Sequence, residues 1–174
     1  MKRKIKLTLG QTIKKDIWRK LYPVFPWLQK YFLKWHLVWH EKGRQPYHIG
    51  WLAPGKTLQE LEKHLHTEWG FGNHFVAWHD NGQVLSWRKL TSFDYQYHLR
   101  VFKDGEIRGH YEYTPESKPV GHFIEIGEEP KIEDFEKFLG HYIVKRKYIS
   151  HLKPDANIAP ESELTIDNEN KWKV

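Results

Sequence analysis

Two polar turns that end in glycine constrain the fold of this chain more than any other feature of its sequence. They are Asp80-Asn81-Gly82 and Lys103-Asp104-Gly105, and each lies within a run rich in aromatic and β-branched residues, 73–90 and 95–113. A three-residue loop with a final glycine suits a type I turn whose last residue is left-handed, and such a loop joins antiparallel strands. The sequence therefore predicts two consecutive β-hairpins.

Helical patterns flank the two hairpins. Segment 26–42 carries an apolar stripe that we interpret as the buried side of a core helix, with an interfacial helix with cationic edges as the alternative. The stripe consists of Leu28, Phe32, Trp35 and Trp39. A second helix is expected after Thr57, because Glu60 follows it at the capping-box spacing. A third covers 131–149, with a break expected at Gly140.

Further strands are expected outside the hairpins. Segment 1–9 alternates apolar and polar residues and predicts a short edge strand, 47–53 predicts another strand, and 120–126 could supply a fifth strand of the sheet. Strands joined by short turns, with helices at both ends of the chain, indicate the α+β class. We expect an antiparallel sheet of four to five strands, built from the two hairpins and packed with two to three helices.

The charge of the chain is concentrated near its N-terminus. The net charge is +6, but residues 1–35 contain ten Lys and Arg against Asp16 alone, so the rest of the chain is slightly acidic. We divide the sequence into a basic N-terminal arm (1–25), a single α+β domain (26–152) and a polar, acidic tail (153–174). The positive charge of the N-terminal segment would attract nucleic acid or an anionic membrane surface. A solvated arm that keeps the protein soluble is the simpler alternative.

The absence of cysteine excludes thiolate catalysis and a disulfide-linked partner. No segment reaches the length of a membrane-spanning helix, and the first ten residues do not resemble a signal peptide. A cytoplasmic location is therefore predicted. The oligomeric state is left open.

The register of the second hairpin decides which side chains share a face. With a loop at Lys103–Gly105, apolar and polar residues separate cleanly, whereas a two-residue loop would mix them. One face, the apolar face, then contains Tyr95, Tyr97, Leu99, Val101, Ile107, Gly109, Tyr111 and Tyr113. The other, the polar face, contains Gln96, His98, Arg100, Phe102, Glu106, Arg108, His110 and Glu112.

Opposed side-chain pairs on the polar face suggest a binding or catalytic site. The register places His98 opposite His110 and Arg100 opposite Arg108, and like charges so close need a counter-ion, either Glu106 and Glu112 or a bound anion. Two facing imidazoles beside a carboxylate could supply acid–base catalysis or a 2-His-1-carboxylate metal site. The bland alternative is the ordinary solvated face of an antiparallel sheet.

The first hairpin could extend this polar strip. Its loop would place His74, Trp78 and Arg88 on the same side, and rings among cations, here Trp78 and Phe102, suit stacking of single-stranded nucleic acid. A helix packed across that face would need the same rings. The nucleotide-binding, zinc-protease and nucleophile-elbow motifs are absent from the sequence.

The leading prediction is a small nucleic-acid-associated module that uses the basic arm and the polar strip. The first alternative is an enzyme acting on a phosphorylated or anionic substrate, and the second is an interaction protein that docks through its Trp-rich helix. An anionic membrane surface ranks below nucleic acid as a partner, and no cofactor or metal is assigned. The candidate catalytic residues are His98, His110 and Glu112. The candidate ligand-binding residues are Gln96, Arg100, Arg108, His74, Arg88, Lys2, Arg3, Lys4, Lys6, Lys14 and Lys15.

Overall fold

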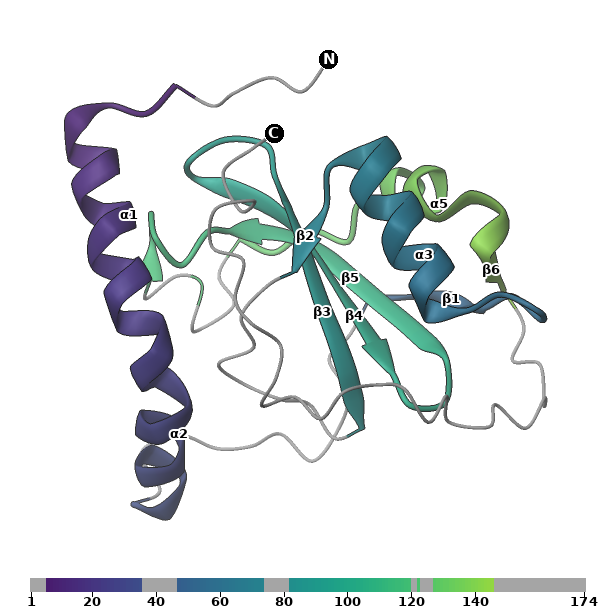
Figure 1. Cartoon of the computed structure of the whole chain (residues 1–174), viewed down its shortest axis with the longest axis horizontal. Coiled ribbons are helices and arrows are strands. Elements are labelled where there is room, and N and C mark those ends of the chain that lie inside the picture. The colour runs from purple at the N-terminus through teal and green to yellow at the C-terminus, as the bar shows by residue number, and fades with distance from the viewer. Residues whose placement is uncertain (1–5, 36–46, 74–81, 120–121, 123–126, 146–174) are drawn as a thin grey trace.

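An antiparallel sheet forms the centre of the molecule (Figure 1). This computed structural model describes residues 6–35, 47–73, 82–119, 122 and 127–145. The strand order is β2-β3-β4-β5-β1-β6, and every pair is antiparallel. The strands are β1 (His48–Leu52), β2 (Gly72–Asn73), β3 (Gln83–Leu90), β4 (Tyr95–Phe102), β5 (Glu106–Tyr113) and β6 (Ile143–Val144).

The helices belong to three parts of the chain, and with the sheet they confirm the predicted α+β class. The N-terminal part contains α1 (Leu9–Leu21), the 3-10 turn η1 (Tyr22–Val24) and α2 (Phe25–Lys34). The middle part contains α3 (Leu58–His64), continued by a π-helical turn, η2 (Leu65–Trp69). After the hairpin come α5 (Ile132–Leu139) and the 3-10 turn η3 (Gly140–Tyr142).

The second hairpin, β4–β5, has the predicted register. Gln96 lies opposite Glu112, His98 opposite His110, and Arg100 opposite Arg108. Gly105 has a φ of 79°, the left-handed conformation that the loop requires of its last residue. The predicted separation of the two faces is therefore confirmed.

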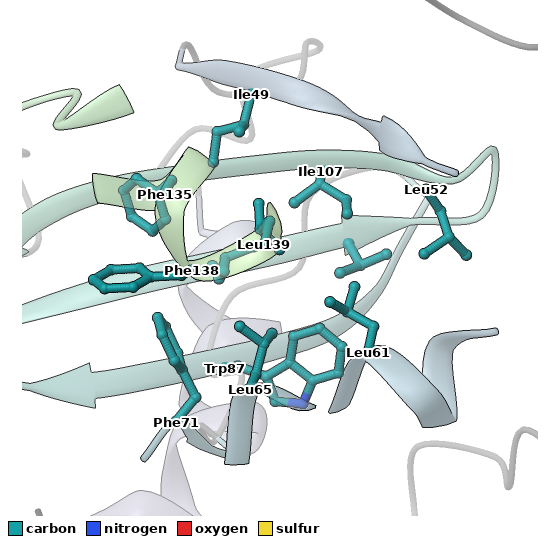
Figure 2. Packing of buried hydrophobic residues seen from close by; sticks show 12 residues of the cluster. Ile49, Leu52, Leu61, Leu65, Phe71, Trp87, Ile107, Phe135, Phe138 and Leu139 are labelled. Carbon is teal, nitrogen blue, oxygen red and sulfur yellow. The ribbon is translucent and has the colours of Figure 1, made fainter. Parts of the chain in front are cut away.

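The apolar face of β4–β5 carries the hydrophobic core. Leu99, Val101 and Ile107 are fully buried in one cluster with residues of α3 and α5. Figure 2 shows Ile107 in this cluster with Leu61 of α3 and Leu139 of α5. Gly109 permits the close approach of α5, because a Cβ at this position would lie 2.8 Å from Cε1 of Phe135. The hydroxyl of Tyr97 donates a 2.6 Å hydrogen bond to Asp134 on the same helix.

The local signals for two helices act as expected. The side chain of Thr57 accepts from the backbone N–H of Glu60, and the Glu60 carboxylate accepts from the N–H of Thr57, so the capping box is confirmed. Gly140, with a φ of 50°, ends α5 at the predicted break.

Several expectations differ from the structure, and the first two concern the N-terminal part of the chain. Residues 6–8 form no regular element and α1 begins at Leu9, so the edge strand predicted for 1–9 is wrong there, and 1–5 lie outside the described residues. The predicted core helix continues only to Lys34, 36–46 lie outside the described residues, and Trp35 is 59% exposed rather than buried. The core position is taken by α3 and α5.

The possible strand at 120–126 also differs from the structure. His122 is helical, since its N–H donates to the carbonyl of Lys118 at 2.9 Å, and 120–121 and 123–126 lie outside the described residues. In the first hairpin, Asn73 lies opposite Trp87, whereas the predicted loop would place Phe75 there. The residues between them, 74–81, lie outside the described residues.

Candidate functional site

Glu112 lies at the centre of a buried polar cluster on the polar face of β4–β5. Only 2% of the residue is exposed. Its Oε1 accepts a 2.7 Å hydrogen bond from Nε2 of Gln96, the residue directly opposite it in β4. The hairpin register thus carries an ionisable group into the interior, on the side of the sheet that does not hold the hydrophobic core.

Two histidines approach this carboxylate from neighbouring positions. Nδ1 of His98 lies 3.0 Å from Oε1 of Glu112, and Nε2 of His110 lies 3.1 Å from Oε2. The two imidazole rings meet edge to face, with their centroids 5.2 Å apart. One possible ligand atom from each of the three residues can be chosen such that all three lie within 4.8 Å of one another.

The outer nitrogen of each imidazole also has a polar neighbour. Nε2 of His98 shares a 2.7 Å hydrogen bond with Oγ of Ser86 on β3. Nδ1 of His110 lies 3.5 Å from a carboxylate oxygen of Glu128, a side chain that is itself buried. The hydrogen bond to Ser86 orients the ring of His98, and the inner nitrogens of both imidazoles lie toward Glu112.

A third histidine, His122, contacts the same carboxylate. Its Nδ1 lies 3.0 Å from Oε2 of Glu112 and 3.0 Å from the carbonyl oxygen of Tyr113. His122 is not among the residues predicted from the sequence, because it lies after the hairpin in a segment that was expected to be a strand. Nothing in the hairpin pattern indicated that it returns to the polar face.

A buried ion pair extends the cluster toward β3. The guanidinium of Arg88 donates to both carboxylate oxygens of Glu116, at 2.8 and 3.2 Å, and to Oε1 of Gln96 at 2.8 Å. Arg88 and Glu116 are both almost fully buried. Gln96 therefore links the Arg88–Glu116 pair to Glu112.

The other arginines lie at the opposite end of the face. Nε of Arg108 donates a 2.8 Å hydrogen bond to Glu106, which is also 2.8 Å from Nδ1 of His48. The expected relief of Arg108 by Glu106 is thus present. Arg100 is partly buried, and its charge contributes to the low pKa of His98.

The pKa values of the buried groups reflect a competition between burial and the charges of their neighbours. Burial acts to raise the pKa of Glu112, but the imidazoles of His122, His110 and His98 hold it well below its usual value. Burial lowers the pKa of His98 to about 3, against the pull of Glu112. The same carboxylate raises the pKa of His122, although burial acts in the other direction. At neutral pH the cluster thus contains an ionised carboxylate and a neutral His98.

The remaining candidate residues are not part of this cluster. Lys6 and Lys14 are exposed and Lys15 is partly exposed, all in the N-terminal part of the chain. Lys2, Arg3, Lys4 and His74 lie outside the described residues. The structure therefore brings together His98, His110, Glu112, Gln96 and Arg88.

Two kinds of chemistry suit this arrangement. Neutral imidazole nitrogens and a carboxylate are ligands for divalent transition metals. The same groups could move protons, but an acid–base pair must reach the atom on which it acts, and here both imidazoles and the carboxylate are buried. Of these two kinds of chemistry, metal binding fits the observed geometry better, because buried groups can hold an ion but cannot easily reach a substrate.

Comparisons with protein-family models, with curated proteins and with solved structures found no significant match to this chain. In the described part of the chain, every helix is too short or too polar to cross a lipid bilayer.

Proposed function

We propose that this protein binds one divalent transition-metal ion of the zinc class, with His98, His110 and Glu112 as its ligands. The observation that carries the proposal is the convergence of two imidazoles and one carboxylate, all buried, with their ligand atoms within 4.8 Å of one another. The set contains two nitrogens and oxygen, which suits zinc and neighbouring first-row metals better than calcium or magnesium.

The spacing of the ligand atoms supports a shared ion. Two ligands held about 2.0–2.1 Å from a tetrahedral metal lie roughly 3.3 Å from each other. The N···O separations between each imidazole and Glu112 are 3.0 and 3.1 Å, slightly inside that value. The two imidazoles contact different oxygens of Glu112, and the three chosen ligand atoms lie within 4.8 Å of one another. Side-chain rearrangement would therefore be needed to admit the ion, with the closest pairs moving apart and the widest pair closing.

One buried nitrogen without a hydrogen bond also supports a bound metal ion. Nε2 of His110 is buried, and although it lies 3.1 Å from Glu112 it makes no hydrogen bond of acceptable geometry. A buried polar atom left without a well-directed partner is costly, and few are found in native proteins. A metal ion between the imidazole and the carboxylate would satisfy this nitrogen.

The outer ring nitrogens of His98 and His110 have the kind of polar neighbours that metal-binding histidines usually have. Such histidines usually give their other ring nitrogen to a carboxylate, a carbonyl or another polar group, which sets the tautomer. Here Ser86 bonds the outer nitrogen of His98, and Glu128 lies near that of His110. His122 and Gln96 would hold Glu112 in place as neighbours of the ligand.

The test is a metal titration of the full-length protein after dialysis against a chelator. Bound zinc is measured by mass spectrometry, and one equivalent per chain is expected. Because a ligand that binds only the folded state stabilises it, zinc at 100 times its Kd should add about 2.7 kcal/mol to the free energy of unfolding. Cobalt(II) provides a second readout through its visible absorption.

Three variants sharpen this test. His110→Gln and Glu112→Gln each remove a ligand, and each should weaken zinc binding by more than the roughly 10–100-fold typical of the loss of a neighbouring contact. Ser86→Ala removes only such a contact and should fall within that range. The matched control is His141→Gln, since His141 is exposed on η3. Absence of stoichiometric metal in the wild type, or equal loss in the control, would overturn the proposal.

Nucleic-acid binding remains a prediction that depends mainly on the basic N-terminal residues. Arg88 and Arg108 are engaged by Glu116 and Glu106, so phosphate contacts would have to come from elsewhere on the surface. The cytoplasmic location and the acid–base enzyme also remain predictions. The enzyme alternative requires a histidine-dependent pH profile that is lost in the double variant His98→Ala/His110→Ala.

A further inference from the structure

The N-terminal helix α1 presents an apolar stripe to solvent. Four of its five large apolar residues recur at every fourth position, so these four lie on one side of the helix, and Trp18 is the fifth. The four are Leu9, Ile13, Ile17 and Leu21, with exposures of 79%, 52%, 51% and 42%. Within the described ranges, every large exposed apolar side chain belongs to residues 9–35.

Lysines lie on both sides of this stripe. Lys14 is three residues before Ile17 and Lys20 three residues after it, so the two lysines border the stripe on opposite sides, and both are exposed. Asp16 is the single acidic residue of α1. An apolar surface bordered by flexible cationic side chains suits the boundary between lipid chains and headgroups, where such side chains extend toward the water.

Exposed aromatic residues also occur on α2 (Phe25–Lys34) and directly after it. Trp27 and Trp35 are exposed, and Tyr31 lies between them with ring centroids 4.5 and 5.4 Å away. Lys30 and Lys34 on the same helix are also exposed. Tryptophan and tyrosine are enriched where proteins meet the membrane–water interface. Figure 1 shows α1 and α2 following one another along one side of the molecule, with α3 and α5 on the other side.

We infer that α1 and α2 bind the surface of an anionic lipid bilayer, with the apolar stripe in contact with the lipid chains and the lysines near acidic headgroups. Charge complementarity selects this occupant, because residues 1–35 carry ten basic side chains and one acid. The inference is independent of the metal site, which uses other residues on another element.

Two other occupants fit the surface less well. Nucleic acid would satisfy the lysines, but its phosphates would leave the stripe of leucine and isoleucine in water. A second copy of the chain would cover the stripe, but it would bring the lysines at its borders close to those of the partner. Lipid satisfies the apolar and the cationic parts together.

The test is sedimentation of the full-length protein with vesicles of phosphatidylcholine alone or mixed with phosphatidylserine. We expect binding to the mixed vesicles that weakens as salt rises, and little binding to the neutral vesicles. Glu112→Gln, which removes a proposed metal ligand, should bind the mixed vesicles as the wild type does. A failure of metal binding therefore leaves this inference standing, and the reverse also holds.

Two sets of variants test the two parts of the surface. Lys14→Gln with Lys20→Gln should weaken vesicle binding about 30-fold. The matched control, Lys63→Gln with Lys103→Gln, loses the same charge from exposed positions elsewhere and should retain binding. Ile13→Ser with Ile17→Ser should weaken binding about tenfold or more, while the urea midpoint of the domain stays unchanged because both side chains are exposed.

Three results would overturn the inference. The first is no binding to anionic vesicles at low salt. The second is binding to a single-stranded oligonucleotide that depends on Lys14 and Lys20, without binding to vesicles. The third is a concentration-dependent dimer that Ile13→Ser with Ile17→Ser converts to monomer, because a second copy would then be the occupant of the stripe.

Discussion

The two faces of the β4–β5 hairpin are both buried, but they are stabilised in different ways. On the apolar face, Leu99, Val101 and Ile107 pack against helices, and the packing does not depend on charge. On the polar face, Glu112 and the neighbouring Arg88 of β3 must find partners, because an unpaired charge inside a protein is costly. Burial on the first face is favourable by itself, whereas burial on the second depends on every member of the cluster.

This difference has a consequence for substitutions. A conservative change on the apolar face alters packing slightly, and the surrounding side chains adjust. A conservative change on the polar face can leave a buried charge without its partner, although the shape of the side chain is almost the same. The faces should therefore respond very differently to changes of equal size.

The largest effect is expected from Arg88→Met, which leaves Glu116 buried without its partner. Removal of one member of a buried ion pair costs about 3–5 kcal/mol. Urea denaturation measures the loss, and Lys103→Met at an exposed position is the control. The double variant Arg88→Met with Glu116→Leu should recover much of the stability. No recovery would mean that the pair is not the cause.

Acid should destabilise the metal-free protein through the polar face. His98 has a folded pKa of about 3 against an ordinary value of 6.5, so the unfolded chain binds the extra proton and stability falls below about pH 6.5. Glu112, whose pKa is lowered, adds a further loss as the pH falls below its ordinary value of 4.5. His122, whose pKa is raised, contributes stability in acid that is lost at higher pH.

Urea midpoints between pH 4 and pH 8 measure this dependence. The account expects a maximum near neutral pH and a decrease on the acidic side that is reduced in His98→Gln. Unchanged acid sensitivity in that variant would show that His98 is not buried in its neutral form.

A pair of near-isosteric changes compares the two faces directly. Glu112→Gln removes the charge that three imidazoles contact, and it should cost about 1.5–3 kcal/mol in the metal-free protein. Leu99→Met on the apolar face should cost less than about 1.5 kcal/mol. Equal losses in urea denaturation would contradict the proposed difference between the faces.

The smallest effect is expected where the apolar face makes a single polar contact. Tyr97→Phe removes the hydrogen bond to Asp134 and keeps the ring that packs on Phe135. A hydrogen bond to a charged group contributes about 1.5–3 kcal/mol when buried, and the partial exposure of this one lowers the expected value to about 1 kcal/mol. Thermal or urea unfolding of this variant gives the value, and a loss of several kcal/mol would mean that the bond has a larger role on that face.

The register of β4–β5 was predictable because two independent signals agreed. The loop Lys103–Gly105 and the alternation of apolar residues on both sides of it allow one clean separation of faces. The capping box at Thr57 and the break at Gly140 were predictable for a similar reason, since each depends on residues near one another in the sequence. Local chemistry therefore specified much of the fold.

The burial of the polar face was not predictable from the hairpin alone. Polar residues that alternate along a strand are also the normal pattern of a solvated face. Glu116, which pairs with Arg88, lies after the end of β5, and His122 belongs to a segment expected to be a strand. Both reach the cluster through tertiary contacts. The available signal was Arg88, a cation expected on the polar side of a hairpin whose strand segments, 73–79 and 83–90, contain no acidic residue.

The N-terminal segment shows how two patterns can compete. Ile5, Leu7 and Leu9 alternate and predict a strand, but the four-residue spacing that begins at Leu9 continues through Ile13 and Ile17. The longer pattern corresponds to α1. The exposed apolar side of α1 was not predicted, because residues 1–25 were interpreted from their charge alone as a basic arm.

The central claim is that a metal ion binds between His98, His110 and Glu112. The most direct measurement is an anomalous diffraction map at the zinc edge, from crystals of the protein grown with zinc. We expect one strong peak about 2.0–2.2 Å from a nitrogen of each of the two histidines and from the Glu112 carboxylate. A map without a peak at this cluster, from crystals in which zinc is bound elsewhere or not at all, would contradict it.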